Sequence, residues 1–203
     1  MAKVIKFPVN APEKLGHKKA RKRKKPDPED LGQLNLFNQI VPEPRVLRFH
    51  EGKGFFEQAL RHDEMGDASA ENLYLKAIEA GESVANAYCN LGILMSTQGK
   101  HARAVDYLTR CLRENPRHYE AHYNLGNLYS EVGNYALARM HYEVSTEVEP
   151  EFPNGYYNLG LVLISLHEYE QATRAINRYI SLSPESDHSV AHDLLKTLKT
   201  LGA

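Results

Sequence analysis

The sequence Asn-Leu-Gly stands at residues 90–92, again at 124–126 and a third time at 158–160. The step from one copy to the next is 34 residues each time. A fixed period of this length is typical of proteins in which one small structural unit is repeated along the chain. The three copies therefore predict a repeat architecture, and the other segments can be placed relative to them.

The pattern around each copy predicts two helices per unit. Apolar residues recur at helical spacing before Gly99, which is suited to the left-handed turn after a helix, and again before Pro116, which stops the next helix. Gly92 and Ala104 are small, so the two helix backbones can approach closely. The same 34-residue step relates three further sets of residues: Ala104, Ala138 and Ala172; Leu108, Tyr142 and Ile176; Pro116, Pro150 and Pro184. Each unit is thus expected to be an antiparallel helical hairpin that buries its apolar face against its neighbours.

On these residues the chain resembles the tetratricopeptide-repeat family. The resemblance implies an all-α solenoid of helical hairpins in residues 51–203, behind a disordered tail and linker over 1–50. Three regular repeats are expected at 85–118, 119–152 and 153–186. An imperfect repeat over 51–84 precedes them, and a capping helix over 187–201 closes the array.

The family resemblance implies that the first helix of each hairpin, here about 85–98, 119–132 and 153–166, lines a concave groove. None of these segments contains a Lys or an Arg, which disfavours the carboxylate clamp of chaperone-binding relatives. Their repeated asparagines resemble the asparagine ladder of O-linked N-acetylglucosamine transferase, whose side chains hold the backbone of an extended peptide. An amide offers a donor and an acceptor to a peptide unit, and a Tyr face can stack on a ligand. The candidate peptide-binding residues are Asn90, Asn124, Asn158, Asn127, Tyr123 and Tyr157.

We therefore predict a non-catalytic protein–protein interaction scaffold that binds an extended, neutral or basic peptide. The alternative for the asparagines is a purely structural role, because Asn before Leu-Gly is common in this family.

The net charge of −1 is the sum of two opposed parts. Residues 1–25 hold ten Lys or Arg and one Glu, a net +9, and the rest hold fifteen and twenty-five, a net −10. The basic cluster consists of Lys18, Lys19, Arg21, Lys22, Arg23, Lys24 and Lys25. It admits contact with nucleic-acid phosphates, a nuclear address in a eukaryote, or a solubilising role. A fourth possibility follows from charge alone: the tail folds back on the acidic body and competes with its ligands.

Residues 33–37 read Gln-Leu-Asn-Leu-Phe and resemble the peptide with which bacterial replication and repair proteins dock on the sliding clamp. The resemblance implies that Leu34, Leu36 and Phe37 enter an apolar pocket while Gln33 bonds at its edge. The second possibility is an apolar segment that packs on the first hairpin. With the basic cluster, this motif supports an alternative function, a DNA-associated adaptor in replication, repair or transcription.

Other classes of function find little support. The two cysteines, Cys89 and Cys111, have no metal-binding spacing, and no catalytic or cofactor motif occurs. The pairs His118/His122 and His188/His192 have a chelating i, i+4 spacing. Neither pair has a Cys or a third His at ligand spacing, although Asp187 and Asp193 adjoin the second pair, and packing or surface roles are expected. No membrane span or secretory signal is found, and a cytoplasmic location is expected. We predict no cofactor, no metal and no enzymatic activity.

Overall fold

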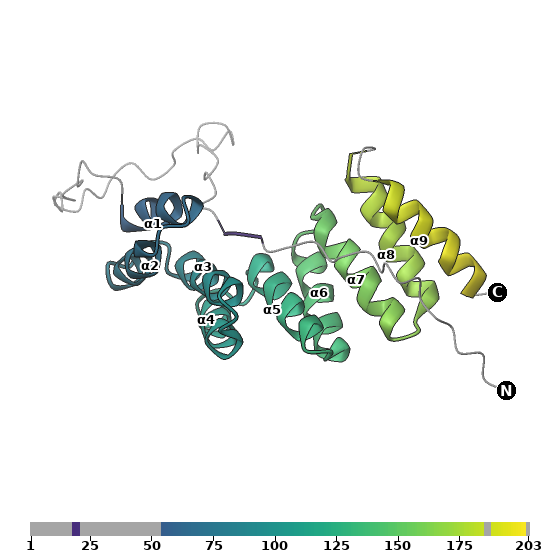
Figure 1. The fold of residues 1–203 in the computed structure, drawn as a ribbon, viewed down its shortest axis with the longest axis horizontal. Helices are drawn as coiled ribbons and strands as arrows, with labels where there is room; N and C mark the ends of the chain where they lie inside the picture. Colours follow the sequence, from purple (N-terminus) through teal and green to yellow (C-terminus); the bar gives the residue numbers. More distant parts are fainter. Residues whose placement is uncertain (1–17, 21–53, 185–187, 202–203) are drawn as a thin grey trace, which may run out of the picture.

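The computed structural model describes residues 18–20, 54–184 and 188–201, and within these ranges the regular elements are all helices. They form antiparallel pairs that follow one another in a row (Figure 1). The pairs are α1 (Phe55–Glu64) with α2 (Ser69–Glu79), α3 (Val84–Thr97) with α4 (His101–Glu114), α5 (Tyr119–Glu131) with α6 (Tyr135–Val148), and α7 (Pro153–Ser165) with α8 (Tyr169–Leu182). A last helix, α9 (His188–Leu201), packs against α8. The predicted all-α solenoid with a capping helix is confirmed.

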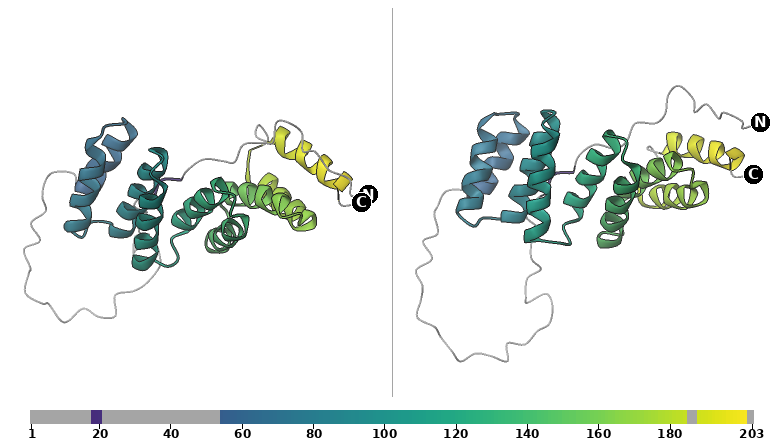
Figure 2. Two further views of the ribbon diagram at one scale, coloured as in Figure 1. Left: turned by 60° about the horizontal axis from the view of Figure 1, so that its bottom comes forward. Right: turned by 90° about the horizontal axis from the view of Figure 1, so that it is seen from below.

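The helices keep the period of the sequence. Helices α4, α6 and α8 begin at His101, Tyr135 and Tyr169, which are 34 residues apart. Each pair packs mainly on itself and on the next pair, so the array does not fold back on its beginning (Figure 2). This arrangement is that of a solenoid, in which each unit depends on its direct neighbours for burial.

The glycine of each Asn-Leu-Gly sequence marks the closest approach of two helices. A Cβ atom on Gly92 would lie 2.6 Å from Leu108 Cγ, and one on Gly126 would lie 2.6 Å from the Tyr142 ring. At Gly160 the nearest atom would be Ile176 Cδ1 at 2.5 Å. Real Cβ contacts are not this short, so the missing side chain allows each hairpin to close.

The imperfect first hairpin has a shorter first helix, of 10 residues where α3 has 14. It nevertheless packs through an apolar cluster in which Phe56 and Ala59 of α1 meet Tyr74 of α2, and Ala87 and Leu91 of α3 belong to the same cluster. The rings of Phe56 and Tyr74 are 6.0 Å apart. This hairpin therefore continues the array although it lacks the Asn-Leu-Gly sequence.

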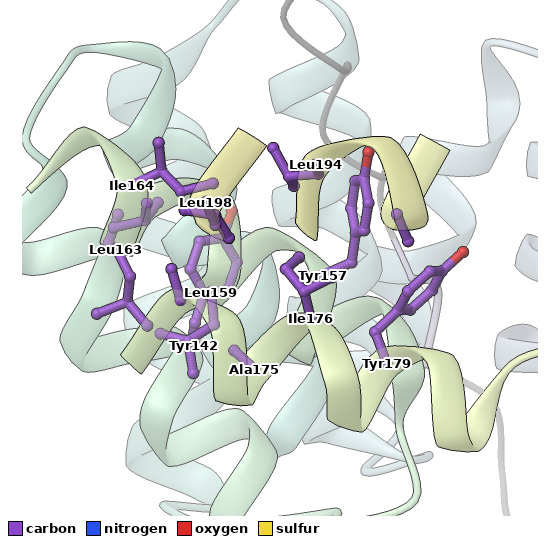
Figure 3. Packing of buried hydrophobic residues seen from close by; sticks show 14 of the residues in the cluster. Tyr142, Tyr157, Leu159, Leu163, Ile164, Ala175, Ile176, Tyr179, Leu194 and Leu198 are labelled. Atoms are coloured by element: carbon purple, nitrogen blue, oxygen red, sulfur yellow. The ribbon is translucent and has the colours of Figure 1, made fainter. Parts of the chain in front are cut away.

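At the other end, Leu194 and Leu198 of α9 join a cluster of buried side chains from α7 and α8 that includes Tyr157, Ile176 and Tyr179 (Figure 3). Helix α9 thus covers an apolar face that would otherwise be open to solvent. Among the described helices, none is long and apolar enough to cross a membrane.

Candidate functional site

Residues 18–20 lie far from the helices in sequence but against them in space (Figure 1). The side-chain amide of Asn90, on α3, binds the backbone of Ala20 twice. Its Oδ1 accepts from the Ala20 N–H at 2.9 Å, and its Nδ2 donates to the Ala20 carbonyl at 3.0 Å. These bonds use only main-chain atoms of Ala20, so they fix the position of the peptide unit rather than the identity of its side chain.

Asn124 repeats this arrangement one unit later, on α5. Its Nδ2 donates to the Lys18 carbonyl at 3.1 Å, and its Oδ1 accepts from the Lys18 N–H at 3.4 Å. The same Nδ2 also donates to the Glu120 carbonyl in its own helix at 2.7 Å, which holds the amide in place. Successive asparagines of the repeat thus bind alternate residues of the segment, which runs antiparallel to the order of the repeats.

Lys19, which lies between Lys18 and Ala20, contacts a different helix. Lys19 Nζ lies 2.7 Å from Asp63 Oδ2, on α1. The Asp63 side chain is 8% exposed and that of Lys19 is 31% exposed, so the pair is largely shielded from solvent. Asp63 Oδ2 also accepts a hydrogen bond of 3.0 Å from the Tyr74 hydroxyl, which orients the carboxylate. We call the surface formed by Asp63, Asn90 and Asn124 the tail-binding surface.

Ala20 is the most deeply buried residue of the segment, with 1% of its surface exposed. It belongs to the apolar cluster that contains Cys89 and Ile93 of α3 and Leu125 and Leu128 of α5. A segment of this composition was predicted to be disordered, but these three residues have defined contacts. The contacts agree with the alternative in which the tail folds back on the acidic body.

The other predicted peptide-binding residues have a different environment. Asn158 Nδ2 donates to Asn127 Oδ1 at 2.9 Å and to the Tyr123 hydroxyl at 3.1 Å, and Tyr142 donates to Asn127 Oδ1 at 2.6 Å. These residues are buried and form a polar network between α5, α6 and α7. Their part in peptide binding stays a prediction.

The two predicted tyrosines pack their rings on other aromatic side chains. Tyr123 meets Phe152 edge-on at 4.9 Å, and Tyr157 lies 4.9 Å from Tyr179. Burial raises the pKa of both hydroxyls, that of Tyr157 to about 12. Both rings therefore contribute to the core, and their stacking on a ligand also stays a prediction.

Cys89, Cys111 and His118 come together in the core, although their spacing in the sequence gave no sign of it. One ligand atom from each lies within 4.8 Å of the others. His118 already uses both ring nitrogens: Nε2 bonds Asn86 Oδ1 at 2.9 Å, and Nδ1 accepts from the Ala121 N–H at 3.3 Å. Burial raises the pKa of Cys89, so its thiol is neutral. The group is part of the hydrogen-bonded core.

The two histidines of the first pair, His118 and His122, contact different partners. His122 lies against His141 of α6, with 3.0 Å between their Nδ1 atoms, while His118 bonds to α3. The side chain of His188 lies outside the described residues, as do the Gln33–Phe37 motif and the basic residues 21–25.

Sequence reasoning missed Asp63. It lies in the imperfect first hairpin, where the repeat pattern is weakest, and nothing in its neighbourhood distinguishes it from a surface carboxylate. The available signal was charge complementarity, since a segment of net +9 is attracted to the acidic side chains of the rest of the chain.

Known protein families match parts of this chain. Models of the tetratricopeptide repeat match residues 85–118, 153–186 and 107–140. No curated protein sequence matches the chain.

Several solved structures share the fold, each at 21% sequence identity or less. The first tetratricopeptide domain of Spaghetti (RPAP3), bound to the HSP90 peptide SRMEEVD, is 20% identical, with a TM-score of 0.54 over 59% of this chain and 94% of that one. MamA from Desulfovibrio magneticus is also 20% identical, with a TM-score of 0.57 over 73% and 93%. The Sgt2 domain from Aspergillus fumigatus is 21% identical, with 0.53 over 58% and 78%. The chain therefore contains tetratricopeptide repeats and folds as a solenoid built from them.

Proposed function

We propose that this protein is a protein-interaction scaffold whose tail-binding surface holds an extended peptide by its backbone. The observation that carries the proposal is the pair of hydrogen bonds between the Asn90 amide and the main chain of Ala20. An amide side chain can donate and accept at once, so it satisfies both the N–H and the C=O of one residue, as a neighbouring β-strand would. Asn124 repeats the contact two residues along the peptide.

Two further observations support this function. A tetratricopeptide domain of similar fold was solved with a bound peptide, SRMEEVD, so peptide capture is known on this architecture. That peptide carries three acidic residues, whereas the tail-binding surface contains Asp63 and its helices α3 and α5 contain no Lys or Arg. The ligand of this protein is accordingly neutral or basic.

The test is binding of a labelled synthetic peptide with the sequence of residues 14–25 to the full chain, measured by fluorescence anisotropy. The chain should carry Ala20→Asp, because a buried carboxylate at this position removes the internal segment from the surface. Adding Asn90→Ala and Asn124→Ala should weaken binding at least tenfold, since each net hydrogen bond contributes about 1 kcal/mol.

Asn177→Ala is the matched control, because Asn177 is exposed on α8, away from the tail-binding surface. It should leave the affinity unchanged. Circular dichroism must show equal helix content in all variants. Equal affinity of the double alanine variant and the control would refute the proposal.

A further inference from the structure

The side chains around residues 19 and 20 favour particular side chains in a bound peptide, which the backbone contacts alone do not. We infer that the tail-binding surface selects a basic residue followed directly by a small one, and that Lys19-Ala20 is its internal example. This inference rests on the proposed function and adds the sequence class of the partner: an extended segment of another protein that contains Lys-Ala or a close equivalent.

The basic residue is selected by Asp63. Its carboxylate is fixed by the Tyr74 hydroxyl at 3.0 Å and lies 2.7 Å from Lys19 Nζ. Because the Asp63 side chain is 8% exposed, a ligand without a cation here would leave the carboxylate buried with no opposing charge. An acidic residue at this position would add repulsion, so the surface discriminates by charge.

The small residue is selected because the backbone of Ala20 is held close to the apolar cluster. Both main-chain groups of Ala20 are bound by Asn90, and its side chain lies in the apolar cluster with Cys89 and Leu125. Only 1% of the surface of Ala20 is exposed. A larger side chain at this position would therefore clash with the cluster unless the hydrogen bonds to the Asn90 amide lengthened. Ala, Gly and Ser fit, whereas Leu or Phe forces the peptide away from Asn90.

The two preferences occur at adjacent residues because an extended chain turns successive side chains to opposite sides. Lys19 reaches toward α1 while Ala20 faces α3 and α5. The pair therefore fixes the register of a bound peptide on the surface. Asn124 adds a backbone contact on the N-terminal side of the pair, at Lys18. A partner that carries this pair competes with residues 18–20 for the same contacts.

The experiment compares peptides of residues 14–25 on the full chain with Ala20→Asp, by fluorescence anisotropy at 150 mM salt. Peptides carrying Lys19→Glu or Ala20→Leu should bind at least tenfold more weakly than the parent. Lys24→Glu is the matched control for charge and should weaken binding by less than threefold. Adding Asp63→Lys to the protein should restore the Lys19→Glu peptide to within threefold of the parent affinity.

Three outcomes separate the possibilities. Equal losses for Lys19→Glu and Lys24→Glu would overturn the inference, because they would mean attraction by total charge alone. Full affinity of the Ala20→Leu peptide would overturn the preference for a small residue. If the parent peptide does not bind at all, the proposed function itself fails, which is distinguishable from a failure of selectivity.

Discussion

Asn90 and Ala20 are 70 residues apart in the chain, yet two hydrogen bonds of 2.9 and 3.0 Å join the side chain of one to the backbone of the other. Four such bonds, one ion pair and a buried methyl group stabilise the docked segment by about 5 to 6 kcal/mol. Ordering three residues costs about 1 to 2 kcal/mol each. The difference favours docking by about 1 to 2 kcal/mol, which corresponds to a roughly tenfold preference for the docked state. A competing ligand can therefore still displace the internal segment.

Competition by the internal segment gives the first prediction. The wild-type chain should bind the peptide of residues 14–25 more weakly than the Ala20→Asp chain, by roughly tenfold, because a tethered segment has a millimolar effective concentration. Titration calorimetry on both proteins measures the ratio. Identical affinities would mean that residues 18–20 do not occupy the surface in solution.

The second prediction concerns hairpin closure. Gly126→Ala should lower the free energy of unfolding by about 1 to 3 kcal/mol, because the new Cβ would lie 2.6 Å from the Tyr142 ring. Urea denaturation followed by circular dichroism gives the value. Asn177→Ala, an exposed change on the neighbouring pair, should alter stability by less than about 0.5 kcal/mol. A similar stability of the two variants would contradict the close approach of α5 and α6.

The third prediction concerns a turn that departs from the repeat. Gly99 and Gly133 occupy the left-handed turn after the first helix with φ of 71° and 74°, but the third repeat has His167 there with φ of 63°. A side chain in this conformation costs about 1 kcal/mol, so His167→Gly should raise the unfolding free energy by about that amount.

His167→Ala serves as the control for this turn. It also loses the bond from the imidazole Nδ1 to the Tyr169 hydroxyl but keeps the Cβ atom, and so it should give no gain in stability. Thermal denaturation of the three proteins separates the effects. Equal stabilisation by Gly and Ala would show that backbone conformation is not the cause.

This turn also shows how far sequence patterning reaches. The 34-residue step predicted the hairpins, the helix ends and the position of the tight contacts, because glycine spacing and apolar periodicity are local consequences of helix packing. It predicted that the first helix of the third repeat ends near residue 166, but not the positive φ of His167, since the repeat pattern alone does not say which residue takes that conformation.

The candidate site was predictable only in part. Asn90 and Asn124 could be named as candidates because the repeat presents them at equal intervals on the first helices. Asp63 was not, because its role depends on where another segment places a lysine. The docking of residues 18–20 was only one of several possibilities, since the high charge density of residues 17–25 favours an unfolded chain and conceals three residues that find specific partners.

The fourth prediction is a loss of stability in mild acid. Burial, and then the charge of His122, lowers the pKa of His141 to about 4, below the value of about 6.5 for an unfolded chain. Between pH 6.5 and 4 the unfolded state therefore binds a proton that the folded state excludes, and stability falls as pH falls. With allowance for its partial exposure, this histidine should account for roughly 1 to 2 kcal/mol.

Urea denaturation at pH 7.5 and pH 4.5 measures this dependence. The wild type should lose more stability between the two values than His141→Gln, which has no titrating ring at this position. Carboxylate protonation affects both proteins alike and cancels in the comparison. The same loss in both would show that His141 is not buried in its neutral form.

The most direct test of backbone capture is hydrogen exchange at one amide, that of Ala20, in the full chain, followed by nuclear magnetic resonance. In the wild type this N–H donates to Asn90 Oδ1 and should exchange at least tenfold more slowly than in an unstructured peptide. Asn90→Ala should abolish the protection, and Asn177→Ala should leave it intact. Exchange at the unstructured rate in the wild type, or protection that survives Asn90→Ala, would contradict the binding of the Ala20 backbone by Asn90.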